Sequence, residues 1–175
     1  MKTLRTYEDF KAIVFHKKQV AISKEAKHLI EESYNFLKEF ANDKIIYGVN
    51  TGFGPMAQYR IEPEDQLQLQ YNLIRSHASG CGEVFDIKTV RAAILCRLNS
   101  LSLGKSGVHI EAIELMRDLL NYRITPLIFQ HGGVGASGDL VQLAQVALTL
   151  IGEGRIKAGQ QWTPANVVFA NYNLK

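Results

Sequence analysis

The sequence predicts a mainly α-helical fold, with residues 1–175 forming one domain. Three observations carry this prediction. Apolar residues recur every three or four positions over long stretches, which is the spacing of a helix that buries one face. Residue types that begin helices stand at the start of several of these stretches. Alternation typical of strands is confined to short pieces in the tail from Arg155 onward.

The first two long helices have clear start signals. Ser23 is the expected N-cap of the first, because its hydroxyl can accept a hydrogen bond from a free backbone N–H of the first turn. Pro63 suits the first position of the second helix, and Glu64 and Asp65 complement the positive end of its dipole. The apolar positions on one face of the first helix are Leu29, Ile30, Phe36, Leu37 and Phe40.

Three further helices are predicted downstream. Apolar residues at helical spacing mark two of them: Val90, Ile94, Leu98 and Leu101, then Ile110, Ile113, Met116 and Leu120. The first of these two is expected to end near Gly104. The last helix, from about 139 to 151, is apolar on nearly every side and is therefore expected to be deeply buried. Residues 167–169, between the turn signals Gly159 and Pro164 and the end of the chain, are expected to be extended.

Composition and charge exclude several classes of protein. Hydrophobic residues make up 46% and charged residues 21%, as in ordinary soluble globular domains. The net charge is +3, and the cations are scattered along the chain, which argues against nucleic-acid binding. The N-terminal stretch is too charged for a signal peptide, and no apolar run approaches the length of a membrane span. A soluble cytoplasmic protein is therefore expected.

The cysteines and histidines show no metal-ligand pattern. Cys81 and Cys96 have neither a CxxC partner nor a neighbouring histidine, so both are expected to be buried free thiols. No metal site is expected, because none of the remaining histidines has ligand spacing: His16, His28, His109 and His131.

Two glycine-rich stretches, 47–54 and 132–138, interrupt the helical pattern. Glycine-dense loops lose much conformational entropy on folding, so they usually serve a specific purpose. Residues 133–138 match the GxGxxG pattern of dinucleotide-binding turns. The context rejects that interpretation, since the Asp139 carboxylate would face the pyrophosphate and the preceding chain is helical rather than βαβ.

The same loop permits a chemical interpretation. In a tight turn the backbone nitrogen of Gly138 can attack the carbonyl carbon of Ala136. Loss of two waters, one from ring closure and one from the Ser137 side chain, leaves a five-membered ring with an exocyclic methylene. This product, methylidene-imidazolone, is an electrophile that none of the twenty side chains supplies.

Three motifs carry a resemblance to a known family. The string Gly-Ala-Ser-Gly-Asp-Leu at 135–140 resembles the prosthetic-group motif of the histidine, phenylalanine and tyrosine ammonia-lyases. The stretch 47–54 resembles their catalytic-tyrosine loop, and 69–80 is similar to their substrate-selecting helix. The likeness continues to residues 151–154. It implies the N-terminal region of a fumarase/aspartase-like helical fold and elimination of ammonia from an aromatic L-amino acid, with no external cofactor.

The resemblance assigns a role to Tyr47, which matches the family's general base for the β-hydrogen of the substrate. A phenol can act as a base only where positive charge or hydrogen bonds stabilise its anion. Asn50 and Gly54 match substrate-binding positions, although both residue types also serve turns. Asp139 and Leu140 match supporting positions beside the electrophile, and Asp139 could equally complement a helix dipole.

Substrate choice is read from Ser76 and His77, which resemble the pair typical of histidine-specific members. Tyrosine-specific members often carry His-Leu there, and phenylalanine-specific members Phe-Leu. L-Histidine, giving trans-urocanate, is the expected substrate, and tyrosine or phenylalanine is the alternative. One departure favours a distinct subgroup: many histidine-specific members read Ala-Pro-Leu where this chain reads Val-Gln-Leu at 141–143.

The resemblance also implies a longer protein. Family members run several hundred residues further and form homotetramers whose active sites combine residues from three subunits. A second tyrosine, an arginine for the substrate carboxylate and a further asparagine would all lie beyond position 175. Residues 1–175 alone are therefore expected to be inactive. A catalytically inactive folded or binding module is the alternative from another functional class.

Overall fold

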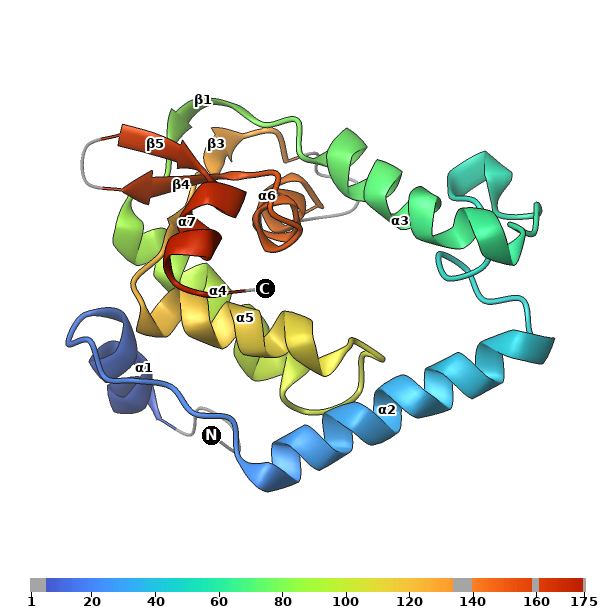
Figure 1. Ribbon diagram of the computed structural model, residues 1–175, viewed down its shortest axis with the longest axis horizontal. Coiled ribbons are helices and arrows are strands. Elements are labelled where there is room, and N and C mark those ends of the chain that lie inside the picture. The colour runs from blue at the N-terminus through green and yellow to red at the C-terminus, as the bar shows by residue number, and fades with distance from the viewer. Residues whose placement is uncertain (1–5, 134–139, 159–160, 175) are drawn as a thin grey trace.

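Helices α4 (Ile87–Leu101) and α5 (Ile110–Asn121) pack side by side at the centre of the molecule. The computed structural model describes residues 6–133, 140–158 and 161–174 (Figure 1). Both helices were predicted, and each buries one face. Asp86 begins α4 by accepting hydrogen bonds from the backbone N–H groups of Lys88 and Thr89. The buried apolar residues are Val90, Ile94, Leu95, Leu98 and Leu101 on α4, and Ile113, Leu115, Met116, Leu119 and Leu120 on α5.

A short helix that the sequence analysis missed, α1 (Tyr7–Val14), packs against α4. Its N-cap is Thr6, and Ile13 and Val14 enter the core. The buried guanidinium of Arg91 donates to the carbonyls of Ile13, at 3.0 Å, and Leu120, at 2.9 Å. These carbonyls belong to the last turns of α1 and α5, where a cation also complements the helix dipoles.

Two helices and the loop between them extend from this core (Figure 1). They are α2 (Lys24–Asp43), the loop 44–62 with its 3₁₀ turn Gly54–Met56, and α3 (Pro63–His77). We call these elements the α2–α3 arm. Ser23 caps α2 and Pro63 begins α3, as predicted. Of the predicted apolar face of α2, Ile30 is buried, whereas Phe36 and Phe40 are exposed and stack on each other. No residue of α3 is buried.

Two small antiparallel sheets lie beside the helices. Strand β1 (Cys81–Val84) pairs with β3 (Phe129–His131), with Cys81 opposite His131. The other sheet has the order β2 (Thr125–Pro126), β4 (Arg155–Ala158), β5 (Gln161–Pro164). Helix α7 (Ala165–Asn171) packs on β4 and β5. The prediction that residues 167–169 are extended was wrong, because Val168 and Phe169 bury one side of this helix.

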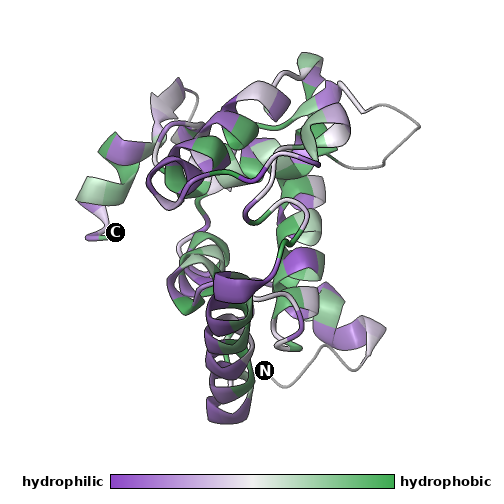
Figure 2. Cartoon of the chain, turned by 90° about the vertical axis from the view of Figure 1, so that its right-hand side faces the viewer, coloured by the Kyte–Doolittle hydropathy of each residue, from purple (hydrophilic) through white to green (hydrophobic). Residues whose placement is uncertain are grey.

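Helix α6 (Leu140–Leu150) packs against α3 and α5. The prediction of burial on nearly every side was wrong. Val141, Gln145, Val146 and Thr149 are buried, but Leu140 is 48% exposed because the neighbouring elements cover only part of the helix surface. Most helices in fact carry both apolar and polar residues (Figure 2).

The two cysteines were also predicted wrongly, since both are exposed. Cys81 lies on the two-stranded sheet, and Cys96 lines an open cleft rather than the core. In the part of the chain that the structure describes, no helix is long and apolar enough to cross a membrane.

Candidate active site

Tyr47 lies in the loop of the α2–α3 arm, and 64% of its surface is exposed. Its phenol oxygen accepts a hydrogen bond from the backbone N–H of Gly54, at 3.3 Å. Its ring meets Phe53 edge to face, with 5.8 Å between centroids. Gly54 has φ +54°, a conformation that glycine adopts without strain. The loop therefore presents the phenol to solvent with a backbone donor on its oxygen.

Asn50 is buried beneath this loop. Its amide nitrogen donates to the carbonyls of Ala41 and Lys44, and its amide oxygen accepts from the N–H of Ile46. These bonds, of 2.7–3.0 Å, attach the loop to the end of α2. They favour the architectural reading of Asn50. The role of Asn50 and Gly54 in binding substrate stays a prediction.

Ser76 and His77 form the last turn of α3. The Nδ1 atom of His77 lies 2.9 Å from the carbonyl oxygen of Leu73 and 3.1 Å from the Ser76 hydroxyl. Since a carbonyl only accepts hydrogen bonds, a bond to Leu73 requires the tautomer with the proton on Nδ1. In the neutral ring Nε2 is then an acceptor, and it has no partner among the residues that the structure describes.

Four predicted site residues, Ala136, Ser137, Gly138 and Asp139, lie outside the described residues. Leu140 is the first residue of α6 and is largely exposed. The chain on either side of 134–139 is described, and it defines where this loop begins and ends.

Gly80, three residues after His77, lies against the segment that enters that loop. A methyl group on Gly132 would lie 3.1 Å from the Gly80 Cα and 2.8 Å from Val141. A methyl group on Gly80 would lie 3.0 Å from the His131 carbonyl oxygen. Such close backbone approach requires glycine. The end of the predicted substrate-selecting segment is therefore in direct contact with the residues that enter the predicted electrophile loop, and Gly132 lies beside Val141, where the chain leaves that loop.

Two glutamines of α6, Gln145 and Gln142, support this junction. The sequence analysis did not identify Gln145. Gln145 is buried, and its side-chain oxygen accepts from the N–H of Phe129 on β3, at 2.8 Å. Gln142 occupies the position where many histidine-specific members have proline. Its amide nitrogen lies 3.5 Å from the Gln130 carbonyl oxygen, so it too reaches β3.

An ion pair that the sequence did not reveal joins α3 to the end of α6. Arg75 Nε lies 2.9 Å from Glu153 Oε2, and Nη2 lies 2.5 Å from Oε1. The pairing raises the pKa of Arg75, and the Arg75 hydrogen bond lowers the pKa of the Glu153 carboxyl. Both residues occur within the family-like motifs, but no local signal shows that they meet.

The Tyr47 loop is attached to the helix that carries His77. Gln70 of α3 donates to the Gly48 carbonyl, at 3.1 Å. His77 follows Gln70 by seven positions, which is about 10 Å along the helix axis. The Tyr47 loop is thus linked to the middle of α3, and His77 lies at the end of this helix that leads to Gly80.

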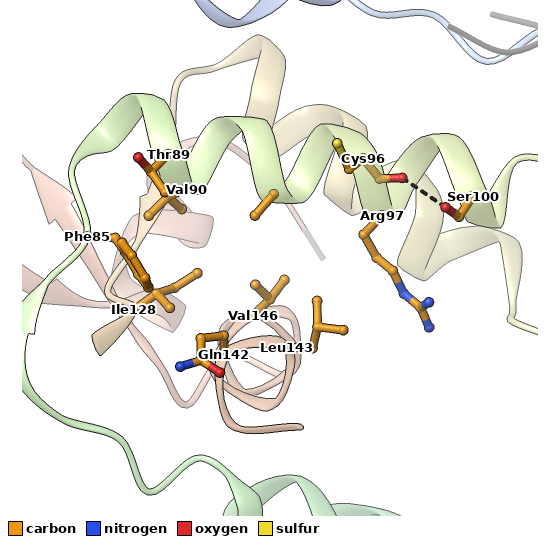
Figure 3. A pocket seen from close by; sticks show the side chains of 11 residues that line it. Phe85, Thr89, Val90, Cys96, Arg97, Ser100, Ile128, Gln142, Leu143 and Val146 are labelled. Atoms are coloured by element: carbon orange, nitrogen blue, oxygen red, sulfur yellow. Dashed lines mark hydrogen bonds between the residues drawn. The ribbon is translucent and has the colours of Figure 1, made fainter. Parts of the chain in front are cut away.

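Two clefts lie beside these helices, and neither is lined by Tyr47, Ser76 or His77. A cleft of about 450 Å³ between α4 and α6 is lined mainly by apolar side chains and does not include Tyr47, Ser76 or His77 (Figure 3). A smaller cleft of about 290 Å³ lies where α3 ends, lined by Ala78, Gln145 and Glu153 among others. The smaller cleft adjoins the end of α3 that carries Ser76 and His77, because Ala78 lines it. No cluster of metal-binding side chains occurs among the described residues.

Comparisons with known proteins agree with these motifs. The chain is 44% identical over 168 residues to a histidine ammonia-lyase of Deinococcus radiodurans, covering 95% of this chain and 32% of the relative. The chain thus spans about a third of that relative's length.

Solved structures share the fold. A tyrosine aminomutase from Streptomyces globisporus has a TM-score of 0.89 at 33% identity, covering 99% of this chain and 32% of that one. An ergothionase from Treponema denticola has a TM-score of 0.92 at 28% identity, covering 99% and 35%. The predicted fold is confirmed. The profile described as aromatic amino acid lyase matches residues 5–175, so the chain belongs to the aromatic amino acid lyase family.

Proposed function

We propose that this chain forms the N-terminal part of an enzyme that eliminates ammonia from L-histidine, giving trans-urocanate. The observation that carries the proposal is the hydrogen bond of His77: its Nδ1 lies 2.9 Å from the Leu73 carbonyl oxygen, which leaves Nε2 to accept a hydrogen bond from a ligand, three residues before the Gly80 contact with Gly132. The relative named histidine ammonia-lyase supports the same substrate.

The acceptor on His77 limits the substrate rings that it can recognise. An imidazole N–H or a phenol O–H can donate to Nε2, whereas a benzene ring cannot. A polar group that is buried on binding and left unpaired discriminates strongly against a substrate without the donor. This chemistry favours histidine or tyrosine over phenylalanine. Tyrosine is the alternative substrate, since a tyrosine aminomutase has the same fold.

The residues of the loop suit a self-formed methylidene-imidazolone. Ala136, Ser137 and Gly138 would form it, Gly80 packs against the chain that enters the loop, and Gly132 lies close to Val141 on the other side. When formed, the group supplies an electrophile that makes the substrate amine a better leaving group. Tyr47 would take the β-proton, and the Gly54 N–H would stabilise the phenolate that this requires. Asp139 and Leu140 would support the group, as the resemblance implies, and Leu140 is the first residue of α6.

We further propose that the complete enzyme is a homotetramer and that residues 1–175 alone lack lyase activity. Arg75, the cation nearest to His77 in sequence, is paired with Glu153 and is not free to bind a substrate carboxylate. Holding a substrate in reacting geometry can contribute about 7–11 kcal/mol toward lowering the barrier. A folded or binding module without activity is the second candidate, favoured by the exposure of Tyr47.

The test uses the complete gene product. Its kcat/KM should be highest for L-histidine among histidine, tyrosine and phenylalanine, and Tyr47→Phe should lower kcat by about 10²–10⁴-fold. Its intact mass should be two waters below the mass calculated from the sequence. The Ser137→Ala variant should show the full mass calculated from its own sequence. An unmodified mass in the assembled wild-type protein would refute the electrophile. Preference for tyrosine would refute the substrate assignment alone, and turnover by residues 1–175 would refute the need for the remaining chain.

A further inference from the structure

Helix α3 carries Ser76 and His77 and packs against α6, but none of its residues is fully buried. Polar links also attach it to neighbouring segments. Near its middle, Gln70 bonds the Gly48 carbonyl, and in its last turn Arg75 binds Glu153. The position of His77 relative to its neighbours therefore depends on a small number of specific contacts.

Glu153 belongs to a rigid turn. Gly152 ends α6 in the left-handed conformation, with φ +81°, and the N–H groups of Glu153 and Gly154 both donate to the Leu148 carbonyl at 3.0 Å. A methyl group on Gly154 would lie 2.4 Å from the Thr149 hydroxyl, so this turn is packed tightly against α6. Glu153 thus presents its carboxylate from a fixed point at the end of α6.

Arg75 is held in a defined orientation. Both of its bonds to Glu153 join nitrogen and oxygen atoms in the parallel two-point geometry that fixes the guanidinium plane. Its guanidinium carbon also lies 5.2 Å from the centre of the Tyr71 ring, one turn earlier on α3. An ordinary surface ion pair between flexible side chains has neither constraint and contributes little.

We propose that Arg75 and Glu153 are a positioning pair for substrate recognition. They fix the last turn of α3 against α6, and so set where the His77 Nε2 lies relative to the ends of the 134–139 loop. His77 is bonded to Leu73 in the same turn, so a shift of that turn moves its ring. The inference rests on the proposed function only for the identity of the ligand.

The test measures equilibrium binding to the complete gene product carrying Ser137→Ala, which prevents turnover. The affinity for L-histidine should fall about tenfold in Glu153→Gln. In a protein that already carries His77→Leu, adding Glu153→Gln should lower the affinity by less than about twofold. Affinity for L-phenylalanine, which has no ring donor, should change less than about twofold. Asp118→Asn, which removes the two-point partner of Arg117 on α5, is the matched control and should leave binding unchanged.

A second readout needs no ligand. Amide hydrogen exchange in residues 71–79 should become at least several-fold faster in Glu153→Gln, and the swapped pair Arg75→Glu with Glu153→Arg should restore protection. Glu153→Asp replaces Glu153→Gln if that variant does not fold. Equal losses of affinity with and without His77, or unchanged exchange, would overturn the proposal. If another amino acid binds more tightly than histidine, the substrate assignment fails, and the cycle is measured with that amino acid.

Discussion

Helices α3 and α4 have the same length, 15 residues, but are stabilised in opposite ways. Helix α4 buries six side chains in the core, whereas α3 buries none fully, packs on the surface of α6, and has polar links to the Tyr47 loop and to Glu153 just after α6. The helix that carries the candidate recognition residues is thus the one with least hydrophobic support. Elements that bind ligands are commonly drawn from the less stable parts of a fold.

Truncating a leucine in each helix should show the largest contrast. Leu95 on α4 is fully buried, and Leu67 on α3 is 69% exposed. Leu95→Ala should lower the free energy of unfolding by about 2–5 kcal/mol through lost burial and a cavity. Leu67→Ala should change it by less than about 0.5 kcal/mol. Urea denaturation of the 175-residue chain measures both, and similar losses would contradict the contrast.

Removing a buried cation from the core should have the next largest effect. Arg91→Met keeps an apolar stem but leaves the carbonyls of Ile13 and Leu120 without their donor. We expect the free energy of unfolding to fall by about 1.5–3 kcal/mol. Arg91→Lys can reach only one carbonyl well and should be intermediate. If Arg91→Met lowered the free energy of unfolding less than Arg91→Lys does, burial of the cation would cost more free energy than its hydrogen bonds contribute.

Crowding the junction between α3 and the loop ends should be less severe. In Gly80→Ala the new methyl would lie 2.5 Å from the Gln145 amide nitrogen and 3.0 Å from the His131 carbonyl oxygen. We expect a loss of about 1–3 kcal/mol. Gly133→Ala is the matched control, because its methyl would lie 3.7 Å from the nearest side-chain atom, Gln142 Oε1. Urea denaturation that finds the two variants alike would refute the tight contact at Gly80.

Local signals in the sequence predicted much of the fold. Ser23 and Pro63 begin helices because capping and a fixed φ act within one turn, and the spacing of Val90, Ile94 and Leu98 reports a core face directly. Predictions failed where tertiary packing decides. Residues 167–169 are β-branched or aromatic, yet they are helical. Cys96 lies among apolar residues in the sequence, yet its side chain lines a cleft.

The candidate site divides in the same way. The motifs identified Tyr47, Ser76 and His77, whose chemistry is a property of the side chain. They could not predict the contact of Gly80 with Gly132, or the pairing of Arg75 with Glu153 across 78 residues, because these depend on how distant segments meet. The roles of residues 136–139 and the substrate remain predictions for the complete gene product.

The attachment of the other arm helix, α2, should show the smallest effect and a distinctive pH dependence. Lys27 of α2 binds Glu114 of α5, and this hydrogen bond lowers the pKa of the Glu114 carboxyl. Because the pKa is lower in the folded state, the pair contributes stability above the unfolded pKa of about 4.3, and the contribution disappears as pH falls through the folded value. Both side chains are about one-third exposed (38% and 32%), so solvent screening keeps the contribution below about 1 kcal/mol.

The stability difference between wild type and Glu114→Gln should therefore be positive at pH 7 and shrink toward zero as the pH falls below about 4. Urea denaturation at a series of pH values measures it. The same comparison in a Lys27→Met background should lose most of its pH dependence, since Arg117, 3.8 Å from Glu114, is the other cation beside this carboxylate. If the pH dependence were unchanged by Lys27→Met, Arg117 would be the dominant partner. The attachment of α2 would then rest on the buried Ala26 and Ile30 and on the hydrogen bond from the Gly107 N–H to the Ser33 hydroxyl, at 3.1 Å, rather than on the Lys27–Glu114 pair.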